Sequence, residues 1–302
     1  MPNGTRRLGA IVVAVAIMAS ACSSTTDSTT SPATGSTAQA GTLHCVAGSI
    51  ITSGSTALLP LVQDAANAYD GHCPGATVTV NGGGSGTGLS QVAQGSVDIG
   101  ASDVLANTKL STPDADTLVD HVVCRQGWIV VTNLDVKGVT NLTTQQNIDI
   151  WTGLDTNWSQ VGGPDLPIIL IFRPQSSGTR ATFKRIVLGG LNEATGGGQT
   201  LTEDSNGAVT TAVSKTNGSV SVIGFSYYND PANKPLLNGL QLDGTDATIA
   251  NVGSGTYKLA ADGNLYTKGQ PSGLTAAFLD FMMSPEVQGT IIPKDSYGPV
   301  AR

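Results

Sequence analysis

Four short polar loops contain residues that could together hold a small anion. They span residues 52–56, 82–88, 99–103 and 173–180. Serine and threonine supply hydroxyl donors, glycine lets backbone N–H groups approach a ligand, and Arg173 supplies a permanent charge on a planar donor. Three of the loops open predicted helices, whose N-terminal N–H groups and partial positive charge favour anions. This combination predicts a site for a small oxyanion, held by neutral dipoles and one arginine.

Each loop taken alone has an ordinary structural explanation. Ser55 and Thr56 could be plain helix caps, and the glycine run could be a flexible turn. Arg173 could form a surface ion pair, and Asp103 could be a structural cap. The glycine run fails the dinucleotide-binding pattern at its last position and lacks the lysine of a nucleotide P-loop, while Ser85 lacks the second glycine of a hydrolase elbow. The anion hypothesis therefore depends on the four loops coming together.

The elements that would bring the loops together follow an α/β pattern, because short β-branched runs alternate with helical stretches from residue 43 onward. Strands are predicted at 43–50, 77–81, 98–101, 122–133 (with a break near 125–126), 168–172 and 220–225. Helices are predicted at 57–69, 89–94, 142–151, 181–188, 209–216 and 274–283. In open α/β sheets ligands bind at the carboxyl ends of strands, where all four loops lie.

The composition narrows the class of protein. The chain has 302 residues, of which 39% are hydrophobic, so it can form a substantial core, and only 12% are charged, which argues against a disordered polyelectrolyte. Its net charge of −7 disfavours a nucleic-acid partner. With 3 Trp, 6 Tyr and 5 Phe, the chain has few rings for a sugar-binding cleft.

Residues 1–21 have the pattern of a secretory signal, with Arg6 and Arg7, an apolar run over 11–18, and small residues after it. The apolar run is too short to span a membrane. Residues 19–22, Ala-Ser-Ala-Cys, resemble the lipobox of bacterial lipoproteins, although that pattern favours Leu or Val in place of Ala19. The resemblance implies that Cys22 carries a lipid anchor, including palmitate, and is the mature N-terminus. The alternative is ordinary secretion with cleavage near Ala21.

The stretch 22–42 is predicted to be a flexible tether, because it is rich in Ser and Thr with Asp27 as its only charge. An anchor followed by a tether places the folded part at the extracytoplasmic face of the cell membrane.

Three cysteines follow Cys22, so at most one disulfide can form among them. Cys45 opens a predicted strand and Cys73 follows a helix that returns the chain to the same end, which favours a Cys45–Cys73 bond over pairings with Cys124. The three histidines lie near the cysteines, but their spacing fits no compact zinc pattern, so no metal is expected.

The loop motifs resemble those of the periplasmic phosphate-binding lipoproteins that serve high-affinity phosphate importers of the ABC type. Residues 55–57 and 84–86 match that family's first two anion-binding turns, and 97–103 matches the strand that ends in its ligand aspartate. Arg173 with 177–180 matches the most specific motif. The similarity covers nearly all of 43–302 and includes 157–158, 161–163 and 284–286.

The resemblance implies a type II periplasmic-binding-protein fold with two α/β lobes, a hinge and a cleft between the lobes. Lobe I would comprise 43–123 and 251–302, lobe II would comprise 124–250, and 257–266 would be a second hinge crossing. Some family members carry an acid, paired with the arginine, where Gln175 stands, so Arg173 is expected to be less restrained. The implied phosphate ligands are Ser55, Thr56, the Ala57 amide, Ser85, Asp103, Arg173, Ser177, Gly178 and Thr179.

The implied function is capture of inorganic phosphate and its delivery to a membrane ABC permease, by a monomer without cofactor or catalysis. Two alternatives stay open. A receptor for sulfate, molybdate or tungstate would avoid an acceptor carboxylate, so Asp103 separates that hypothesis from phosphate. A secreted serine hydrolase would use Ser85 or Ser177, but no histidine lies near either in the sequence.

Overall fold

The computed structural model describes residues 43–194 and 200–300. The predicted signal segment, Cys22 and the tether lie outside the described residues. Within the described ranges, no helix is long and apolar enough to cross a membrane. The same part of the chain contains no group of three or more His, Cys, Asp or Glu residues that could hold a metal ion.

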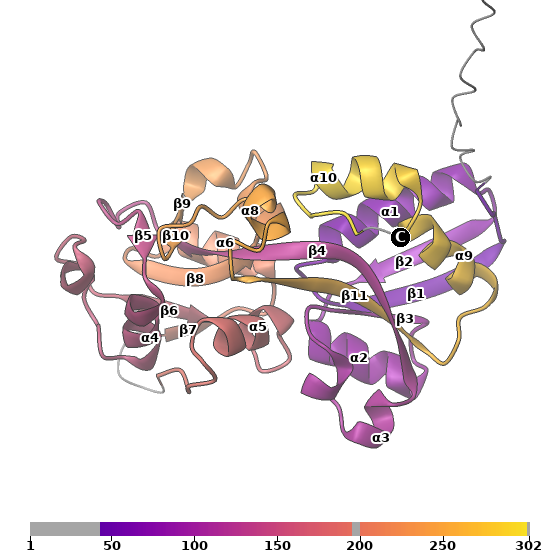
Figure 1. Ribbon diagram of the computed structural model, residues 1–302, viewed down its shortest axis with the longest axis horizontal. Helices are drawn as coiled ribbons and strands as arrows, with labels where there is room; N and C mark the ends of the chain where they lie inside the picture. The colour runs from indigo at the N-terminus through magenta and orange to yellow at the C-terminus, as the bar shows by residue number, and fades with distance from the viewer. Residues whose placement is uncertain (1–42, 195–199, 301–302) are drawn as a thin grey trace, which may run out of the picture. The chain divides into compact units, whose positions relative to one another are not determined.

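Nine of the described strands form one sheet, in which eight follow a single path and β9 branches from β4, and the predicted α/β class is confirmed. In its first part the order is β2-β1-β3-β11-β4, with β1 parallel to β2 and β3, and β11 antiparallel to β3 and β4 (Figure 1). The bounds are β1 Gly48–Gly54, β2 Ala76–Asn81, β3 Ile99–Ser102, β4 Leu118–Thr132 and β11 Ala260–Lys268.

Helices cover both faces of this first part. Helices α1 and α9 share a core in which Tyr69 packs edge-on to Phe278, and Leu265 of β11 joins them. Helix α2 lies on the opposite face, where Leu89 packs with Tyr266, the next residue of β11 (Figure 1). Adjacent strand residues thus bury side chains on opposite faces, as pleating requires. The bounds are α1 Leu59–His72, α2 Ser85–Gln94 and α9 Gly273–Met282.

The second part of the sheet begins where β4 leaves β11. From Trp128 onward β4 pairs antiparallel with β8, which is followed by the parallel strands β6 and β7, and β9 adds to β4. Aliphatic side chains and buried aromatic residues from its strands, helices and loops fill a separate core. The bounds are α4 Thr144–Thr152, β6 Ile169–Phe172, α5 Gly178–Ile186, β7 Thr200–Thr202, α6 Asn206–Lys215, β8 Ser219–Gly224, α7 Phe225–Tyr228, β9 Asn238–Gly239 and α8 Ile249–Gly253.

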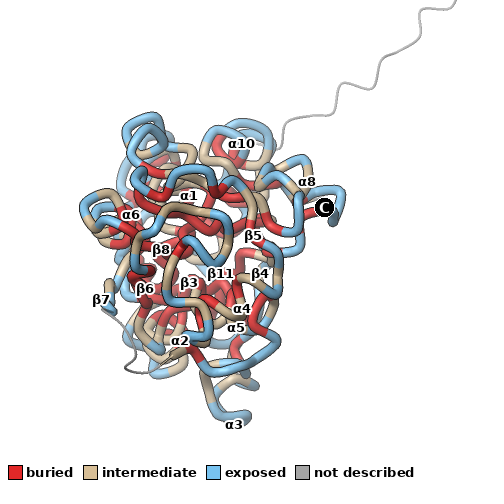
Figure 2. The backbone as a smooth tube through the Cα atoms, turned by 90° about the vertical axis from the view of Figure 1, so that its left-hand side faces the viewer, coloured by how far each residue is buried: buried red, intermediate tan, exposed pale blue. Residues whose placement is uncertain are grey.

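Short elements complete the described chain, and Figure 2 shows their exposed loops in pale blue around the buried strands in red. They are α3 Thr112–Ala115, the pair β5 Asn141–Leu142 with β10 Gln241–Leu242, α10 Ile292–Lys294, a π-helical turn Val287–Ile291, and 3₁₀ turns at Ala106–Thr108, Trp158–Val161 and Lys234–Leu236.

Two differences from the predicted elements bear on function. The break predicted near residues 125–126 is wrong, because β4 is continuous from Leu118 to Thr132, and its irregularity is a bulge at Val123 opposite the Gly263–Asn264 step of β11. Helices α2, α5 and α6 begin three or four residues earlier than predicted, at Ser85, Gly178 and Asn206. Residues 85–88 and 178–180, assigned to loops from the sequence alone, therefore form the first turns of α2 and α5.

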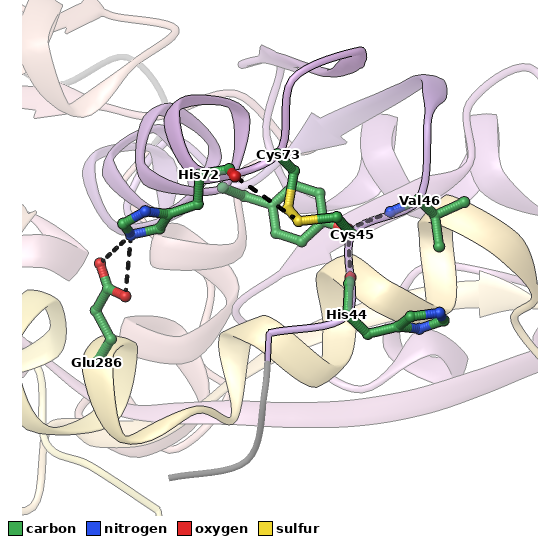
Figure 3. The surroundings of a disulfide bond; sticks show 7 residues. His44, Cys45, Val46, His72, Cys73 and Glu286 are labelled. Atoms are coloured by element: carbon green, nitrogen blue, oxygen red, sulfur yellow. Dashed lines mark hydrogen bonds and ion pairs between the residues drawn. A yellow bond between two sulfur atoms is a disulfide. The ribbon is translucent and has the colours of Figure 1, made fainter.

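The predicted Cys45–Cys73 disulfide is present, with the two Cα atoms 5.2 Å apart (Figure 3). It joins the segment before β1 to the residue that ends α1. Beside it, His72 Nε2 lies 3.0 Å from Glu286 Oε1, which ties the end of α1 to the C-terminal part of the chain. Cys124 is a free thiol and is buried in the first core.

Candidate anion-binding site

Asp103 is the centre of a buried polar cluster at the carboxyl end of β3. Its side chain is enclosed, and both carboxylate oxygens have donors. Ser55 Oγ donates to Oδ1, Gln126 Nε2 donates to the same oxygen at 3.2 Å, and Thr179 Oγ1 donates to Oδ2 at 3.3 Å. Burial raises the pKa of Asp103, while the hydrogen bonds from Ser55 and Gln126 and the charge of Arg173 oppose that rise.

Ser55 connects this carboxylate to the start of α1. Its Oγ accepts from the N–H groups of Ala57 at 3.1 Å and Leu58 at 3.2 Å while it donates to Asp103. Ser55 therefore holds the turn that leads into α1 and contacts the Asp103 carboxylate at the same time. The Ala57 amide, which the family resemblance assigns to the ligand, points to Ser55 in this structure.

Ser85 is completely buried as the first residue of α2. Its Oγ accepts the Asp103 N–H at 2.9 Å, so it fixes the turn after β3. The preceding Gly84 has φ +88°, in the left-handed region, and donates its N–H to Gly54 at 2.8 Å. Glycine is therefore needed at position 84 for the chain to enter α2 beside β1.

Arg173 follows β6 and is only 4% exposed. Its Nε donates to the Glu203 carbonyl at 3.0 Å, and its Nη2 donates to the Asp204 carbonyl at 3.0 Å and to Thr56 Oγ1 at 3.2 Å. Its Nη1 is buried without a hydrogen-bond partner among the described residues. Burial lowers the pKa of Arg173, and the nearby charge of Asp103 raises it.

The absence of an acid at position 175 does not leave Arg173 without restraint. The side chain of Gln175 is exposed, but two backbone carbonyls from the segment before α6 hold the guanidinium instead. Because these two partners are backbone carbonyls, the side-chain types at positions 203 and 204 do not predict them.

Asn206, the first residue of α6, is a component of the cluster that sequence reasoning missed. Its N–H and Nδ2 both donate to Thr56 Oγ1, at 3.3 and 3.0 Å, and its Oδ1 accepts from Gly224. Thr56 therefore receives bonds from Asn206 and Arg173, and its own hydroxyl proton is available for another acceptor. The signal that could have identified Asn206 is the polar run 204–206 opening a helix.

The N-terminus of α5 completes the cluster. Ser177 Oγ caps the helix by accepting the Arg180 N–H at 3.2 Å, and Thr179 Oγ1 accepts from Trp128 Nε1 at 3.1 Å. The Gly86 N–H donates to the Ser176 carbonyl at 2.8 Å, so the loops before α2 and α5 meet directly. The structure thus brings all four predicted loops together.

The described residues place no histidine at either candidate nucleophile. Ser85 Oγ accepts a backbone N–H and Ser177 Oγ caps α5, whereas His72 pairs with Glu286 and His121 Nε2 lies 3.0 Å from Thr267 Oγ1. This geometry gives the hydrolase hypothesis no support. What the cluster offers is hydroxyl donors, helix N-termini, one arginine and one carboxylate around a small volume.

Comparison with known proteins gives consistent relatives. The model of the PBP superfamily domain matches residues 24–286. The phosphate-binding protein PstS of Bacillus subtilis is 41% identical over 253 residues, which cover 84% of this chain and 81% of that protein. A Clostridium perfringens substrate-binding protein solved with bound phosphate has a TM-score of 0.75 and 29% identity, over 84% of this chain and all of that one. An ABC-type phosphate transport receptor from Vibrio cholerae has a TM-score of 0.65 and 28% identity over the same shares.

Proposed function

The chain belongs to the PBP superfamily and, within it, to the family of the phosphate-binding protein PstS, and from this premise we propose that it captures inorganic phosphate and delivers it to an ABC permease. The ligand would lie among Ser55, Thr56, the Ala57 amide, Ser85, Asp103, Arg173, Ser177, Gly178 and Thr179. Binding, not catalysis, is the activity proposed.

The observation that carries this proposal is the unpaired Nη1 of Arg173. A buried charged donor without an acceptor costs free energy, so its position favours an anionic oxygen as partner. The hydroxyl proton of Thr56 and the N-terminal N–H groups of α5 offer further donors beside it. An oxyanion would satisfy these groups together.

Asp103 supports phosphate over the other oxyanions. Both phosphate species present near neutral pH keep an O–H, which the Asp103 carboxylate can accept. Sulfate has no such proton and would place its oxygens against a buried negative charge. Sites that require a hydrogen bond reject analogues without it by roughly 10⁴–10⁵-fold.

Calorimetric titration tests this assignment. Protein freed of bound ligand should bind phosphate tightly, and sulfate and molybdate orders of magnitude more weakly. Equal affinity for sulfate and phosphate would overturn the role of Asp103 and the phosphate assignment with it.

We further propose that the fold works as two lobes, 43–123 with 251–302 and 124–250, which close on the ligand. Two separate hydrophobic cores support a division into two lobes, with Val252, Tyr257 and Leu259 packed in the core of lobe II ahead of the return to lobe I. The loops of the two proposed lobes meet through the Gly86–Ser176 bond and through Lys109 Nζ, which donates to the Gln175 carbonyl at 2.6 Å. The protein would act as a monomer, which light scattering with and without phosphate would test.

A lipid anchor at Cys22 is the remaining part of the proposal. Cys22→Ala should release the protein from membranes or cause its precursor to accumulate. Detergent-phase partitioning is the measurement, and an unchanged partition of the variant would overturn the anchor.

A further inference from the structure

Four cationic side chains line a hollow of about 360 Å³ beside the candidate site. They are Lys109, which follows the turn after β3, and Arg180, Lys184 and Arg185 of α5. Among the residues that the structure describes, no acidic side chain lines this hollow, which we call the basic pocket. In a chain with a net charge of −7, such a concentration of positive charge needs an explanation.

Internal pairing neutralises only a small part of this charge. Arg180 Nη2 forms an ion pair with Glu193 at 2.5 Å. Lys184 Nζ donates to the neutral Asn192 side chain, and Lys109 Nζ donates to a neutral carbonyl. Arg185 is exposed and has no hydrogen-bond or ion-pair partner among the described residues. One carboxylate therefore faces four cations, and the pocket keeps a positive excess.

The basic pocket adjoins the anion site in two ways. Lys109 reaches the loop that follows Arg173, because its Nζ bonds to the Gln175 carbonyl. Thr108 and Arg185 also line a second hollow of about 420 Å³ that includes Asp103. In that hollow the charges of Arg125 and Asp262 offset each other in an ion pair of 2.7 Å. Arg185 is therefore the cation of this second hollow whose charge is not offset by an ion pair, and it lies in the same hollow as Asp103.

We propose that the basic pocket steers phosphate into the site and sets its rate of association. This inference rests on the proposed function. A protein of net negative charge repels a phosphate mono- or dianion at long range, but a local patch of opposite charge can raise association rates by 10–10³-fold. The steering acts through the field of exposed side chains, so it must be screened by salt.

Arg185 is the residue that isolates this effect. Lys109 bonds to a ligand loop and Arg180 bonds to the Arg173 carbonyl, so changes there would also disturb the site. Arg185 has no such contact, and removing its charge alters the field alone. At a distance of about 10 Å in water, one charge changes the encounter rate of a dianion by about 2- to 4-fold.

Stopped-flow tryptophan fluorescence across a series of NaCl concentrations tests the proposal, since Trp128 bonds to Thr179 within the site. The wild-type association rate should fall as salt rises, which is opposite to the rise expected if the net charge governed the encounter. Arg185→Gln should lower the rate by about 2- to 4-fold at low salt, converge with the wild type at high salt, and leave dissociation unchanged. Calorimetry should show the dissociation constant raised by the same factor.

Lys268→Gln provides the matched control. Lys268 is an exposed lysine at the end of β11 whose side chain has no partner within the described ranges, and it lies six residues or about 20 Å along the strand from Asp262. Its variant should behave as the wild type at physiological salt. An association rate that rises with salt, or an Arg185→Gln effect on dissociation alone, would overturn the steering while phosphate binding stood. Absence of phosphate binding by calorimetry would instead overturn the proposed function.

Discussion

The backbone of Gly178 lies directly against the side chain of Asp103. A β-carbon on residue 178 would fall 2.7 Å from the Asp103 Cβ and 2.8 Å from its Oδ2, and it would overlap Ser85 Oγ as well. Because Gly178 is the first residue of α5, the absence of a side chain lets the N-terminus of that helix reach the carboxylate and Ser85 together. The glycine is needed for space.

Gly178→Ala should therefore separate affinity from stability. The added methyl prevents close approach of α5 to Asp103, and we expect phosphate affinity to fall at least 100-fold, or about 3 kcal/mol. Thermal stability without ligand should change little, because alanine favours helix by about 1 kcal/mol. The control is Gly253→Ala in α8, where no heavy atom lies within 4 Å of the added carbon. Equal phosphate affinity in both variants would contradict the proposed closure on Asp103.

Substitution of Arg173 should weaken binding strongly. Loss of one partner from a buried charge pair costs about 2–5 kcal/mol, so Arg173→Ala should lose most phosphate affinity. Arg173→Lys should recover only part of it, because lysine cannot hold the Glu203 carbonyl and an anion with one planar fork. Calorimetry gives the affinities, and melting curves reveal any loosening of the 203–204 segment. Wild-type affinity in Arg173→Ala would mean that phosphate binds elsewhere.

Asp103→Asn should change selectivity more than affinity. The amide can donate to an oxyanion, so the variant should accept sulfate that the wild type rejects. Burial raises the pKa of Asp103, so on acidification this carboxylate becomes protonated at a higher pH than an ordinary aspartate. Protonation removes the negatively charged acceptor of the phosphate O–H. Wild-type phosphate affinity should fall with decreasing pH as this occurs, and the asparagine variant should lack that component. Competitive titration with sulfate across pH measures both effects, and the role of Asp103 fails if the two proteins respond alike.

Removal of the disulfide should cost stability without changing affinity. The bond closes a loop between positions 28 residues apart, for which loop entropy predicts about 3.6 kcal/mol. It lies at the end of α1 away from Ser55, about 20 Å along a helix of 14 residues. The double variant Cys45→Ser with Cys73→Ser should melt at lower temperature yet titrate normally with phosphate. The wild-type protein with this disulfide reduced should show the same melting temperature and affinity as the double variant. Cys124 is buried, and burial raises its pKa, so its thiol should resist thiol reagents until the protein unfolds.

Asp295→Asn should stabilise the protein at neutral pH. Burial and the charge of Asp64 raise the pKa of Asp295 to about 6, so the folded state binds a proton that the unfolded state releases at lower pH. The ionised carboxylate therefore destabilises the fold above pH 6, and the penalty disappears as pH falls toward 4. We expect a gain of about 1 kcal/mol, or about 2–4 °C in Tm, at pH 7.5 and none at pH 4. Asp116→Asn, at an exposed site, is the control; an equal shift in both variants, or one independent of pH, would contradict this account.

The position of the site was predictable because strand ends meet at one edge of an α/β sheet. Residues such as Ser85 and Arg173 could be selected from local pattern alone. The partners of Asn206 and Gln126 could not be predicted, because these side chains contact Thr56 and Asp103, which lie 150 and 23 residues away. The break in β4 is wrongly predicted because the polar residues 125–126 interrupt an apolar run. In the structure the strand continues through Gln126, whose buried side chain is satisfied by its hydrogen bond to Asp103.

The order in which the first core is assembled has a consequence for when the chain can fold. Tyr69 of α1 packs on Phe278 and Phe281 of α9, with ring centres 5.9 and 5.5 Å apart, and β11 lies between β3 and β4. Until these late residues have been synthesised, the early strands have an open edge and an uncovered face. Completion of the core is therefore deferred until nearly the whole polypeptide exists. Such a delay would suit export directed by the secretory signal predicted for residues 1–21, in which the chain crosses a membrane before it becomes compact.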